Sequence, residues 1–519
     1  MQKELIKANI VVFIASFCTL VIELVAGRIM APYVGVSLYT WTSIIGVVLA
    51  GISIGAYLGG LLADRYPRPT TLGWLLFLSG LGALTISPLT NLVGTAEFQT
   101  SLMVRILLIT TIIFFAPSCL LGMISPVVVK LALNNLEKTG NVVGKIYAFS
   151  TLGSIIGTFA TGFFLISWMG TRNILFMMAV ILILSALVFG GSFMKRKSVA
   201  VIVIILAPFL WTFYSYAFKA PVDGNTYYFK ESDYYTIKLK KHDTRDGKRK
   251  VDALILDHLI HSINDVNDPL YLDYEYIRMY EELIRWQMQH RNSFKALFIG
   301  GGGYTFPRYL EVRYPGARID VVEIDPEVTR VVYRYLGLPR DTKIRSFNED
   351  GRWFVMNCKE KGSYDFIFGD AFNDISIPYH LTTREFNFRL AELLKPDGVL
   401  LANLIDSYER GLFMPSYIRT LEDVFGKGHV HLISRSPDYK RIGISTFIVA
   451  ASRQPLDIED FSRFLKSEGD QKKMSFIIPQ DRLQEHLGRR PATVLTDDYV
   501  PVDNLSAPIF EERFGYRKK

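Results

Sequence analysis

Four consecutive glycines, Gly300 to Gly303, follow the short apolar run ALFI at residues 296–299. An apolar run of strand length that leads into glycines is typical of a tight strand-to-helix turn, because glycine adopts positive φ and lets a ligand approach the backbone closely. A flexible linker would more often contain Ser, Pro and charged residues. We therefore expect Gly300, Gly301 and Gly302 to form a turn that binds a nucleoside.

Acidic residues end the next three predicted strands. Glu323 comes about 20 residues after the glycines, at a spacing where a carboxylate accepts hydrogen bonds from both hydroxyls of a ribose. Asp350, followed by Gly351, ends the next strand and is expected beside an adenine. Asp370 ends the last one and is expected to face the reacting centre. The alternative for Asp350 and Asp370 is a role as a helix cap or a turn former.

Strands and helices alternate in this part of the chain, which predicts an α/β Rossmann-like, doubly wound parallel sheet within residues 269–519. In such a sheet, ligands bind at the edge formed by the carboxyl ends of the strands. A helix at 268–290 is predicted to precede the sheet. The predicted strands are 295–303, 317–325, 341–350 and 364–372, and the predicted helices are 304–315, 326–338 and 351–362.

Two stretches with alternating polar and apolar residues, 227–243 and 248–262, come before this domain. The turn-forming sequence TRDG separates them, so they predict antiparallel strands. A small antiparallel β-domain is therefore expected at residues 221–268.

Residues 1–220 are much more apolar and contain about seven stretches long enough to cross a bilayer as helices. This part is predicted to be a multi-pass α-helical transmembrane domain. The stretches are 8–26, 41–63, 71–93, 103–129, 147–168, 174–194 and 199–218. Small residues on one side of a membrane helix allow close packing, and the second stretch offers Gly46, Gly51, Gly55, Gly59 and Gly60 for this purpose.

The composition agrees with a membrane protein. Hydrophobic residues make up 50% of the chain and the mean hydropathy is +0.21, both high for a soluble protein. The net charge of +8 would also suit nucleic acid, but Lys and Arg beside membrane segments give the same excess, so we expect no nucleic-acid partner. The three cysteines are scattered and form no CxxC pattern, so we expect neither a disulfide framework nor a metal site.

Positive charge predicts the orientation, because cytoplasmic loops are rich in Lys and Arg. With the N-terminus inside, the cytoplasmic loops carry Lys3, Lys7, Arg65, Arg68, Lys130, Lys138, Lys145, Lys195, Arg196 and Lys197, and the other side carries Arg28, Arg105 and Arg172. Seven full crossings would then place the C-terminal domains outside. We favour a re-entrant or interfacial stretch at 199–218, where Pro208 precedes a run of aromatic residues. The protein would then be a multi-pass protein of the cell membrane, with its catalytic domain in the cytoplasm. The alternative is that the number of membrane-crossing stretches, counted as seven, is wrong by one.

The C-terminal part of the sequence resembles a known family. Residues 226–450 are similar to the spermidine synthases, or polyamine aminopropyltransferases, and the whole chain resembles their membrane-fused branch. The similar stretches are ESDYYTIKL, LILDHLIHS, FIGGGGYTFPRYL, VVEIDPEV, NEDGRWF, YDFIFGDAF, YHLTTREF and LLKPDGVLLANL. GGLLADRYPR at 59–68 resembles a loop signature of major facilitator transporters.

The resemblance implies roles for the three strand-end acids. Glu323 would hold the ribose of decarboxylated S-adenosylmethionine, Asp350 its adenine, and Asp370 would deprotonate the attacking amine. His261 stands at the position of a cofactor-binding Gln. The YHE of the family corresponds to Tyr274, Glu275 and Tyr276, from which we expect Tyr274 to contact the substrate and Tyr276 to assist catalysis.

The chain also departs from the family pattern. The glycine turn GGGDGG of the family carries an Asp that reads the transferred aminopropyl group, and Gly303 stands there instead. The second acid of the family's DxxD is Asn373, with Asp374 one residue later as a candidate catalytic residue. Late in the chain, Asp497 and Asp498 either close the acceptor pocket or form a solvated turn.

Three functions remain open on these residues. The first is aminopropyl transfer from decarboxylated S-adenosylmethionine to an amine, which could be delivered by the membrane. The second is methyl or other alkyl transfer from, or cleavage of, S-adenosylmethionine itself, with a membrane-associated or lipid substrate. The third is a transporter or sensor that only binds a nucleotide. Half of a facilitator is expected to serve as an anchor unless a homodimer completes a pathway.

Overall fold

The computed structural model describes residues 2–94, 100–133, 139–191, 224–244, 247–371, 377–467 and 474–513. Internal contacts divide the chain into two compact units. The first unit comprises Met1–Asp223 with Glu231–Asp233, and the second comprises Gly224–Lys230 with Tyr234–Lys519.

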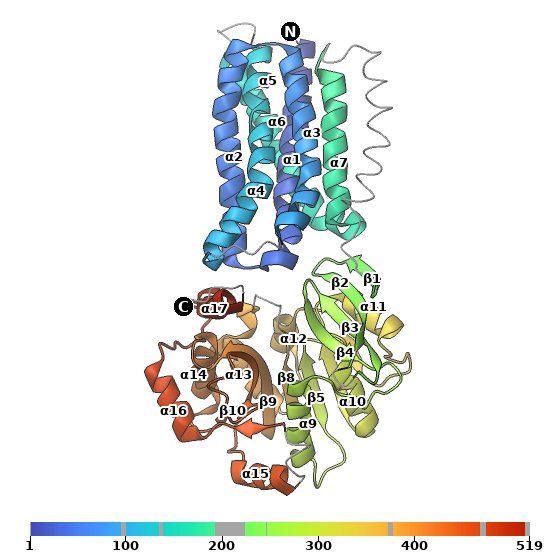
Figure 1. The fold of residues 1–519 in the computed structure, drawn as a ribbon, viewed down its shortest axis with the longest axis vertical. Coiled ribbons are helices and arrows are strands. Elements are labelled where there is room, and N and C mark those ends of the chain that lie inside the picture. The colour runs from blue at the N-terminus through green and yellow to red at the C-terminus, as the bar shows by residue number, and fades with distance from the viewer. Residues whose placement is uncertain are drawn as a thin grey trace. The chain divides into compact units, whose positions relative to one another are not determined.

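The first unit is a bundle of long helices (Figure 1). Its elements are α1 (Gln2–Val34), α2 (Leu38–Arg65), α3 (Pro69–Val93), α4 (Leu102–Gly122), α5 (Ile124–Ala132), α6 (Thr139–Ala160), a π-helical turn (Thr161–Leu165) and α7 (Ile166–Phe189). By length and composition, 5 helical runs within the described residues could cross a membrane.

Six of the predicted apolar stretches coincide with these helices, with one difference in how they are divided. The stretch 147–168 and residues 174–189 of the stretch 174–194 belong to a single helical run, Thr139–Phe189. Gly170 interrupts this run, because its φ of 73° and ψ of 161° are not helical. The stretch 199–218, predicted to be re-entrant, lies outside the described residues.

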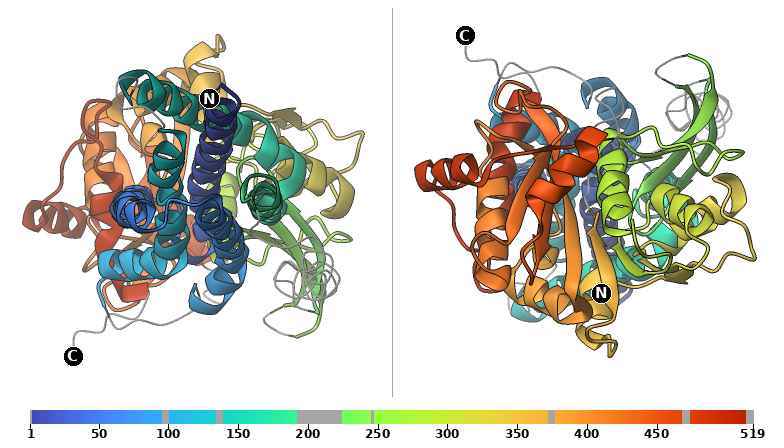
Figure 2. Two further views of the ribbon diagram at one scale, coloured as in Figure 1. Left: turned by 90° about the horizontal axis from the view of Figure 1, so that it is seen from above. Right: turned by 90° about the horizontal axis from the view of Figure 1, so that it is seen from below.

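Fewer glycines of α2 pack closely against a neighbouring helix than the sequence predicts. A Cβ at Gly55 would lie 2.1 Å from the carbonyl oxygen of Cys119, and one at Gly59 would lie 2.6 Å from Met123. Gly51 similarly contacts α4, whereas a Cβ at Gly46 or Gly60 would meet nothing within 4 Å. The packing face therefore consists of three glycines spaced four residues apart, since residues i and i+4 share one side of a helix. Figure 2 shows these helices nearly along their axes.

The second unit begins with the antiparallel strands that the sequence predicts. A four-stranded sheet has the order β1-β2-β3-β4, and β3 pairs antiparallel with both β2 and β4. The strands are β1 (Thr226–Glu231), β2 (Thr236–Asp243), β3 (Lys250–Leu256) and β4 (Leu259–Asn264).

A larger sheet of eight strands follows, in the order β12-β10-β11-β9-β8-β5-β6-β7. The strands from β9 to β7 are parallel, but β11, β10 and β12 add an antiparallel edge that the sequence analysis did not predict. The strands are β5 (Lys295–Ile299), β6 (Arg318–Val322), β7 (Arg345–Phe347), β8 (Tyr364–Gly369), β9 (Leu394–Ser407), β10 (Val430–Ser434), β11 (Ile444–Ser452) and β12 (Phe476–Ile477).

Helices cover both faces of this sheet, so it has a hydrophobic core on each side. Ala296 and Phe298 of β5 pack with α9, α10 and α11, whereas Leu297 and Ile299 pack with α13 and α14, as the alternation of side chains along a strand requires. The helices are α9 (Glu275–Gln287), α10 (Thr305–Arg313), α11 (Pro326–Tyr335), α12 (Gly351–Asn357), the 3-10 turn η3 (Tyr379–Leu381), α13 (Arg384–Leu393), α14 (Phe413–Phe425), α15 (Ile458–Ser467), α16 (Gln480–Arg489) and α17 (Val502–Arg513).

The packing of α2 on α4 can be tested at one glycine. Gly55→Ala is expected to lower the free energy of unfolding of the detergent-solubilised protein by about 1–3 kcal/mol, the usual cost of overpacking, and with it the melting temperature. The reason is that the new Cβ would collide with the backbone at Cys119. Gly60→Ala is the matched control, and it should be neutral or stabilising because alanine favours a helix and nothing lies near its Cβ. Equal melting curves for the two variants, followed by circular dichroism, would show that Gly55 is not in this interface.

Candidate active site

The glycine turn joins β5 to α10 and packs directly against the end of β8. Gly300 has a φ of 98°, and a Cβ there would lie 2.5 Å from the carbonyl oxygen of Asp370. Gly302 also has positive φ, at 46°. Glycine is therefore required at both positions, at Gly300 by conformation and by space and at Gly302 by conformation.

Glu323 follows β6 and holds this turn in place. One carboxylate oxygen accepts hydrogen bonds from the backbone N–H groups of Gly301 at 2.9 Å and Gly302 at 3.1 Å, and the other accepts one from Asp325 N–H at 3.0 Å. Burial raises the pKa of Glu323, while these three backbone hydrogen bonds lower it. A carboxylate oxygen accepts more than one hydrogen bond, so this arrangement leaves Glu323 able to bind a further donor.

Asp350 is a helix cap, as the alternative interpretation proposed. One oxygen accepts a hydrogen bond from Trp353 N–H at 2.9 Å at the start of α12, and the other lies 3.1 Å from Nε2 of His380. Gly351 is buried, and a Cβ there would lie 2.8 Å from Ile299. Asp350 and Gly351 lie between β7 and α12, at the carboxyl edge of the sheet.

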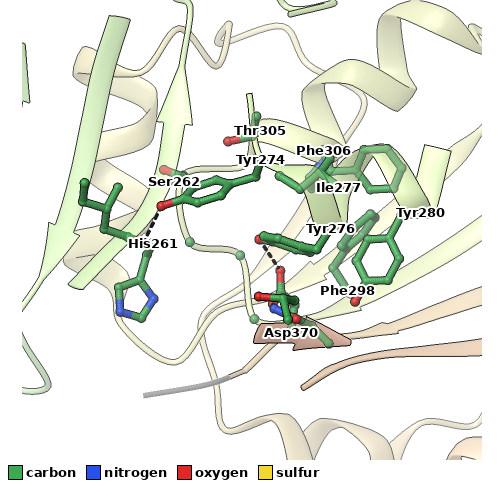
Figure 3. A pocket seen from close by; sticks show the side chains of 18 of the residues that line it. His261, Ser262, Tyr274, Tyr276, Ile277, Tyr280, Phe298, Thr305, Phe306 and Asp370 are labelled. Atoms are coloured by element: carbon green, nitrogen blue, oxygen red, sulfur yellow. Dashed lines mark hydrogen bonds between the residues drawn. The ribbon is translucent and has the colours of Figure 1, made fainter. Parts of the chain in front are cut away.

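Asp370 lies where β8 ends, among neutral hydrogen-bond donors. Its Oδ2 accepts a hydrogen bond from the Tyr276 hydroxyl at 3.0 Å (Figure 3). Its Oδ1 accepts one from the Asn403 amide at 2.8 Å. Burial raises the pKa of Asp370 to about 6, and the two hydrogen bonds oppose that rise. A carboxylate with a pKa near the working pH is suited to accept and release a proton.

A cavity of about 140 Å³ opens beside Asp370. It contains six further residues that the sequence analysis predicted for the site: Gly300, Gly301, Gly302, His261, Tyr274 and Tyr276. The other lining residues are Leu259, Ile260, Ser262, Ile277, Tyr280, Phe298, Gly303, Thr305, Phe306, Pro307, Asn403, Ile405 and Thr446. The wall thus combines aromatic and aliphatic side chains with a smaller share of polar groups, as is common in small-molecule sites.

Two predicted residues of this wall have defined surroundings. Burial lowers the pKa of His261 to about 4, so its imidazole is neutral at pH 7. The Tyr274 hydroxyl donates a hydrogen bond to the carbonyl oxygen of Ile260 at 2.9 Å, which ties the start of α9 to β4.

Five other predicted residues that the structure describes are not part of this lining: Glu323, Asp350, Gly351, Asp497 and Asp498. The carboxylate of Asp497 pairs with the guanidinium of Arg352, which also donates a hydrogen bond to the carbonyl oxygen of His380 at 2.8 Å. Asp498 follows Asp497 in the short turn bridged by Thr496 and Tyr499. The candidate catalytic residue Asp374 lies outside the described residues.

The sequence analysis missed Asn403 and Ser262. Asn403 is the single amide side chain in the largely buried, apolar strand β9. A polar side chain inside such a strand needs a hydrogen-bond partner, and this could have drawn attention to Asn403 in the sequence. Ser262 gave no signal of its own, since strands often carry serine.

Among the described residues, no cluster of three or more His, Cys, Asp or Glu side chains could hold a metal ion.

The strand order, the antiparallel edge and the glycine turn after β5 define a methyltransferase-like Rossmann fold. Residues 279–451 match the family description Spermine/spermidine synthase domain. This part of the chain is therefore similar to spermine/spermidine synthase domains.

Individual proteins are similar to parts of this chain. The chain is 30% identical over 192 residues to the polyamine aminopropyltransferase of Vibrio vulnificus, covering 34% of this chain and 63% of that protein. It is 34% identical over 169 residues to the N-terminal histidine N-methyltransferase of Emericella nidulans, covering 31% of this chain and 29% of that protein. It thus spans less than two thirds of either relative. A solved structure of a probable spermidine synthase from Corynebacterium glutamicum is 22% identical, with a TM-score of 0.45 over 55% of this chain and 99% of that chain.

Proposed function

We propose that the chain is a membrane-bound transferase that moves an aminopropyl group from decarboxylated S-adenosylmethionine to an amine. The observation that carries this proposal is the buried carboxylate of Asp370, whose pKa is about 6, in a cavity lined by the glycine turn. The relationship to polyamine aminopropyltransferases supports the choice of donor.

The chemistry requires few groups. The amine nitrogen attacks the carbon next to the sulfonium, a C–N bond forms, and the C–S bond breaks as its electron pair returns to sulfur. The leaving group is methylthioadenosine, and the proton lost by the amine passes to Asp370. Because the sulfonium carbon is already activated, the protein has to align the nucleophile, accept its proton and exclude water.

The roles of the other residues are part of the proposal. Glu323 would hold the ribose and Asp350 the adenine, because both lie at the carboxyl edge of the sheet. Tyr276 would orient Asp370 through its hydrogen bond of 3.0 Å. Tyr274 would line the path of the acceptor, since it belongs both to this cavity and to an adjoining pocket with Arg435 and Glu275.

A second candidate function keeps the same cavity but uses intact S-adenosylmethionine. Gly303 favours it, because residue 303 offers no carboxylate to bind the ammonium end of a decarboxylated donor. The relationship to an N-methyltransferase also fits this possibility.

We further infer that the helical unit anchors the enzyme in the cell membrane, with the catalytic unit on the cytoplasmic side, where a soluble nucleoside co-substrate is present. The excess of Lys and Arg on the predicted cytoplasmic loops supports this orientation. The acceptor would then be a small amine or an amine-bearing lipid. A homodimer is compatible with this arrangement.

The nature of the donor decides between the two functions. Purified full-length protein is expected to release methylthioadenosine from decarboxylated S-adenosylmethionine in the presence of amines or lipid extract. Asp370→Asn should lower kcat by roughly 10²–10⁴-fold, the usual contribution of a general base, and leave nucleoside binding intact. Asp341→Asn, at an exposed position, is the control. S-adenosylhomocysteine from the intact donor would favour methyl transfer, and binding without any turnover would contradict both functions.

The pH dependence should report Asp370 directly. The carboxylate accepts a proton only when it is ionised, so kcat should rise as the pH increases through about 6. Tyr276→Phe removes a hydrogen bond that lowers the pKa of Asp370, so the acid limb of the profile should move to higher pH. Tyr274→Phe is the matched control, because the Tyr274 hydroxyl binds Ile260 rather than Asp370. An acid limb that stays in place in Tyr276→Phe would exclude Asp370 as its source.

The orientation can be tested in sealed vesicles. Protease added to right-side-out vesicles should leave residues 224–519 intact, because a cytoplasmic domain is enclosed by the membrane. The same protease should degrade this domain in inverted vesicles. Cleavage of the domain in intact right-side-out vesicles would place it outside the cell.

A further inference from the structure

Two neighbouring acids, Asp497 and Asp498, lie in the turn at residues 496–499, which we call the C-terminal turn. The carboxylate of Asp497 forms an ion pair with the guanidinium of Arg352 on α12, and its backbone N–H donates a hydrogen bond to Glu385 at 3.0 Å. The side chain of Asp498 makes no hydrogen bond or ion pair with any described residue. Neither acid lines the cavity of the candidate site, so the role of Asp497 has to be sought at Arg352.

Arg352 connects the C-terminal turn with two other segments. Its Nη1 donates hydrogen bonds to the carbonyl oxygen of His380 at 2.8 Å and to the hydroxyl of Thr383, the cap of α13, at 3.0 Å. The Arg352 side chain is 20% exposed and that of Asp497 is 43% exposed, so the guanidinium lies inside this contact and the carboxylate at its rim. A guanidinium has five N–H donors in a planar fork and can hold all three partners at once.

The position of η3 depends on this contact. η3 is a single turn of three residues, Tyr379–Leu381, and none of them is fully buried. Two backbone hydrogen bonds within residues 378–382 close the turn. A helical turn this short has little stability of its own. The hydrogen bond from Arg352 to the carbonyl oxygen of His380 therefore helps to fix η3 in place.

η3 carries two side chains that border the expected position of the nucleoside base. Nε2 of His380 lies 3.1 Å from Oδ2 of Asp350. Leu381 lines an apolar cavity of about 30 Å³, and a Cβ at Gly351 would lie 3.7 Å from its side chain. The side chain of Asp350 is 36% exposed, and a carboxylate has about four lone-pair positions, so it can accept a further hydrogen bond from a ligand.

We propose that Asp497 acts through Arg352 as a positioning residue for the nucleoside base. The Asp497–Arg352 pair holds η3 in place. His380 then orients the Asp350 carboxylate toward the exocyclic amine of adenine, and Leu381 lies beside the ring. This inference rests on the proposed function, because it takes Asp350 to bind adenine. It gives the C-terminal turn a role in donor affinity rather than in the acceptor pocket.

Equilibrium binding of two nucleosides to the full-length protein in detergent, measured by calorimetry, tests this role. The probes are methylthioadenosine and methylthioinosine, in which a carbonyl oxygen replaces the exocyclic amine of the base. The wild type should bind methylthioadenosine more tightly by about tenfold or more, because the amine donates a hydrogen bond to a carboxylate. Asp497→Asn should weaken the binding of methylthioadenosine by about threefold to tenfold and that of methylthioinosine less, so that the ratio narrows.

Three further variants sharpen the comparison. Asp498→Asn is the matched control, because it removes the same charge one residue away from the pair, and it should leave both affinities unchanged. Arg352→Lys keeps the positive charge but loses the planar fork that holds Asp497 and His380 together, so it should also narrow the ratio. Asp350→Asn combined with Asp497→Asn should lose no more selectivity than Asp350→Asn alone, because both changes act on one contact.

Kinetics and melting separate positioning from a purely structural role. In Asp497→Asn the KM for the sulfonium donor should rise by about threefold to tenfold, while kcat at saturation stays unchanged because Asp370 and its hydrogen bonds are not altered. The melting temperature should change little, because a partly exposed ion pair contributes little to stability. A lower melting temperature with an unchanged nucleoside ratio would show that the pair only stabilises the fold, and it would overturn the inference.

The outcomes distinguish the inference from the proposed function. Failure of the wild type to bind either nucleoside would contradict the proposed function and the inference with it. A wild-type ratio that is preserved in both Asp497→Asn and Arg352→Lys would overturn the inference alone. Equal affinities of the wild type for the two nucleosides would remove Asp350 from base recognition and so overturn the inference, while the proposed transfer reaction would stand.

Discussion

The close approach of the glycine turn to the end of β8 is the constraint on which the site depends. Because Gly300 lacks a Cβ, the backbone of Asp370 can lie against it. Glu323 then fixes the turn through the N–H groups of Gly301 and Gly302. Any larger residue at Gly300 would separate β5 from the end of β8 and displace Asp370 from its place beside the cavity.

The regular parts of this fold could be predicted from the sequence because they depend on local pattern. Strand-length apolar runs, the glycine turn and the strand-end acids all follow from periodicity and from the special conformations of glycine. The antiparallel edge of the sheet and the α2 glycines without neighbours could not be predicted, because pairing partners and helix faces depend on distant parts of the chain. The same holds for Asn403, which meets Asp370 only through the pairing of β8 with β9.

The small sheet illustrates this limit at the site itself. The sequence suggests a separate β-domain, yet β4 contributes His261 and Ser262 to the cavity, and Asn264 holds the glycine turn. No local pattern connects residue 262 with residue 303. A Cβ at Gly303 would lie 1.8 Å from Oγ of Ser262, so their coupling is steric, and it is visible only when the two backbones are placed against each other. A departure from a family motif at one position can therefore have its explanation in an unrelated part of the chain.

Burial also explains how a carboxylate could deprotonate an amine at this site. An alkylamine in water has a pKa of about 10, some six units above that of a free carboxylate, so transfer between them is unfavourable. Desolvation disfavours both charged forms, and it has already raised the pKa of Asp370 to about 6. The same largely apolar wall would lower the pKa of a bound amine, so the two values approach each other from opposite sides. In the proposed reaction, the aromatic residues around Tyr276 would therefore contribute to the proton transfer by excluding water, without contacting the proton themselves.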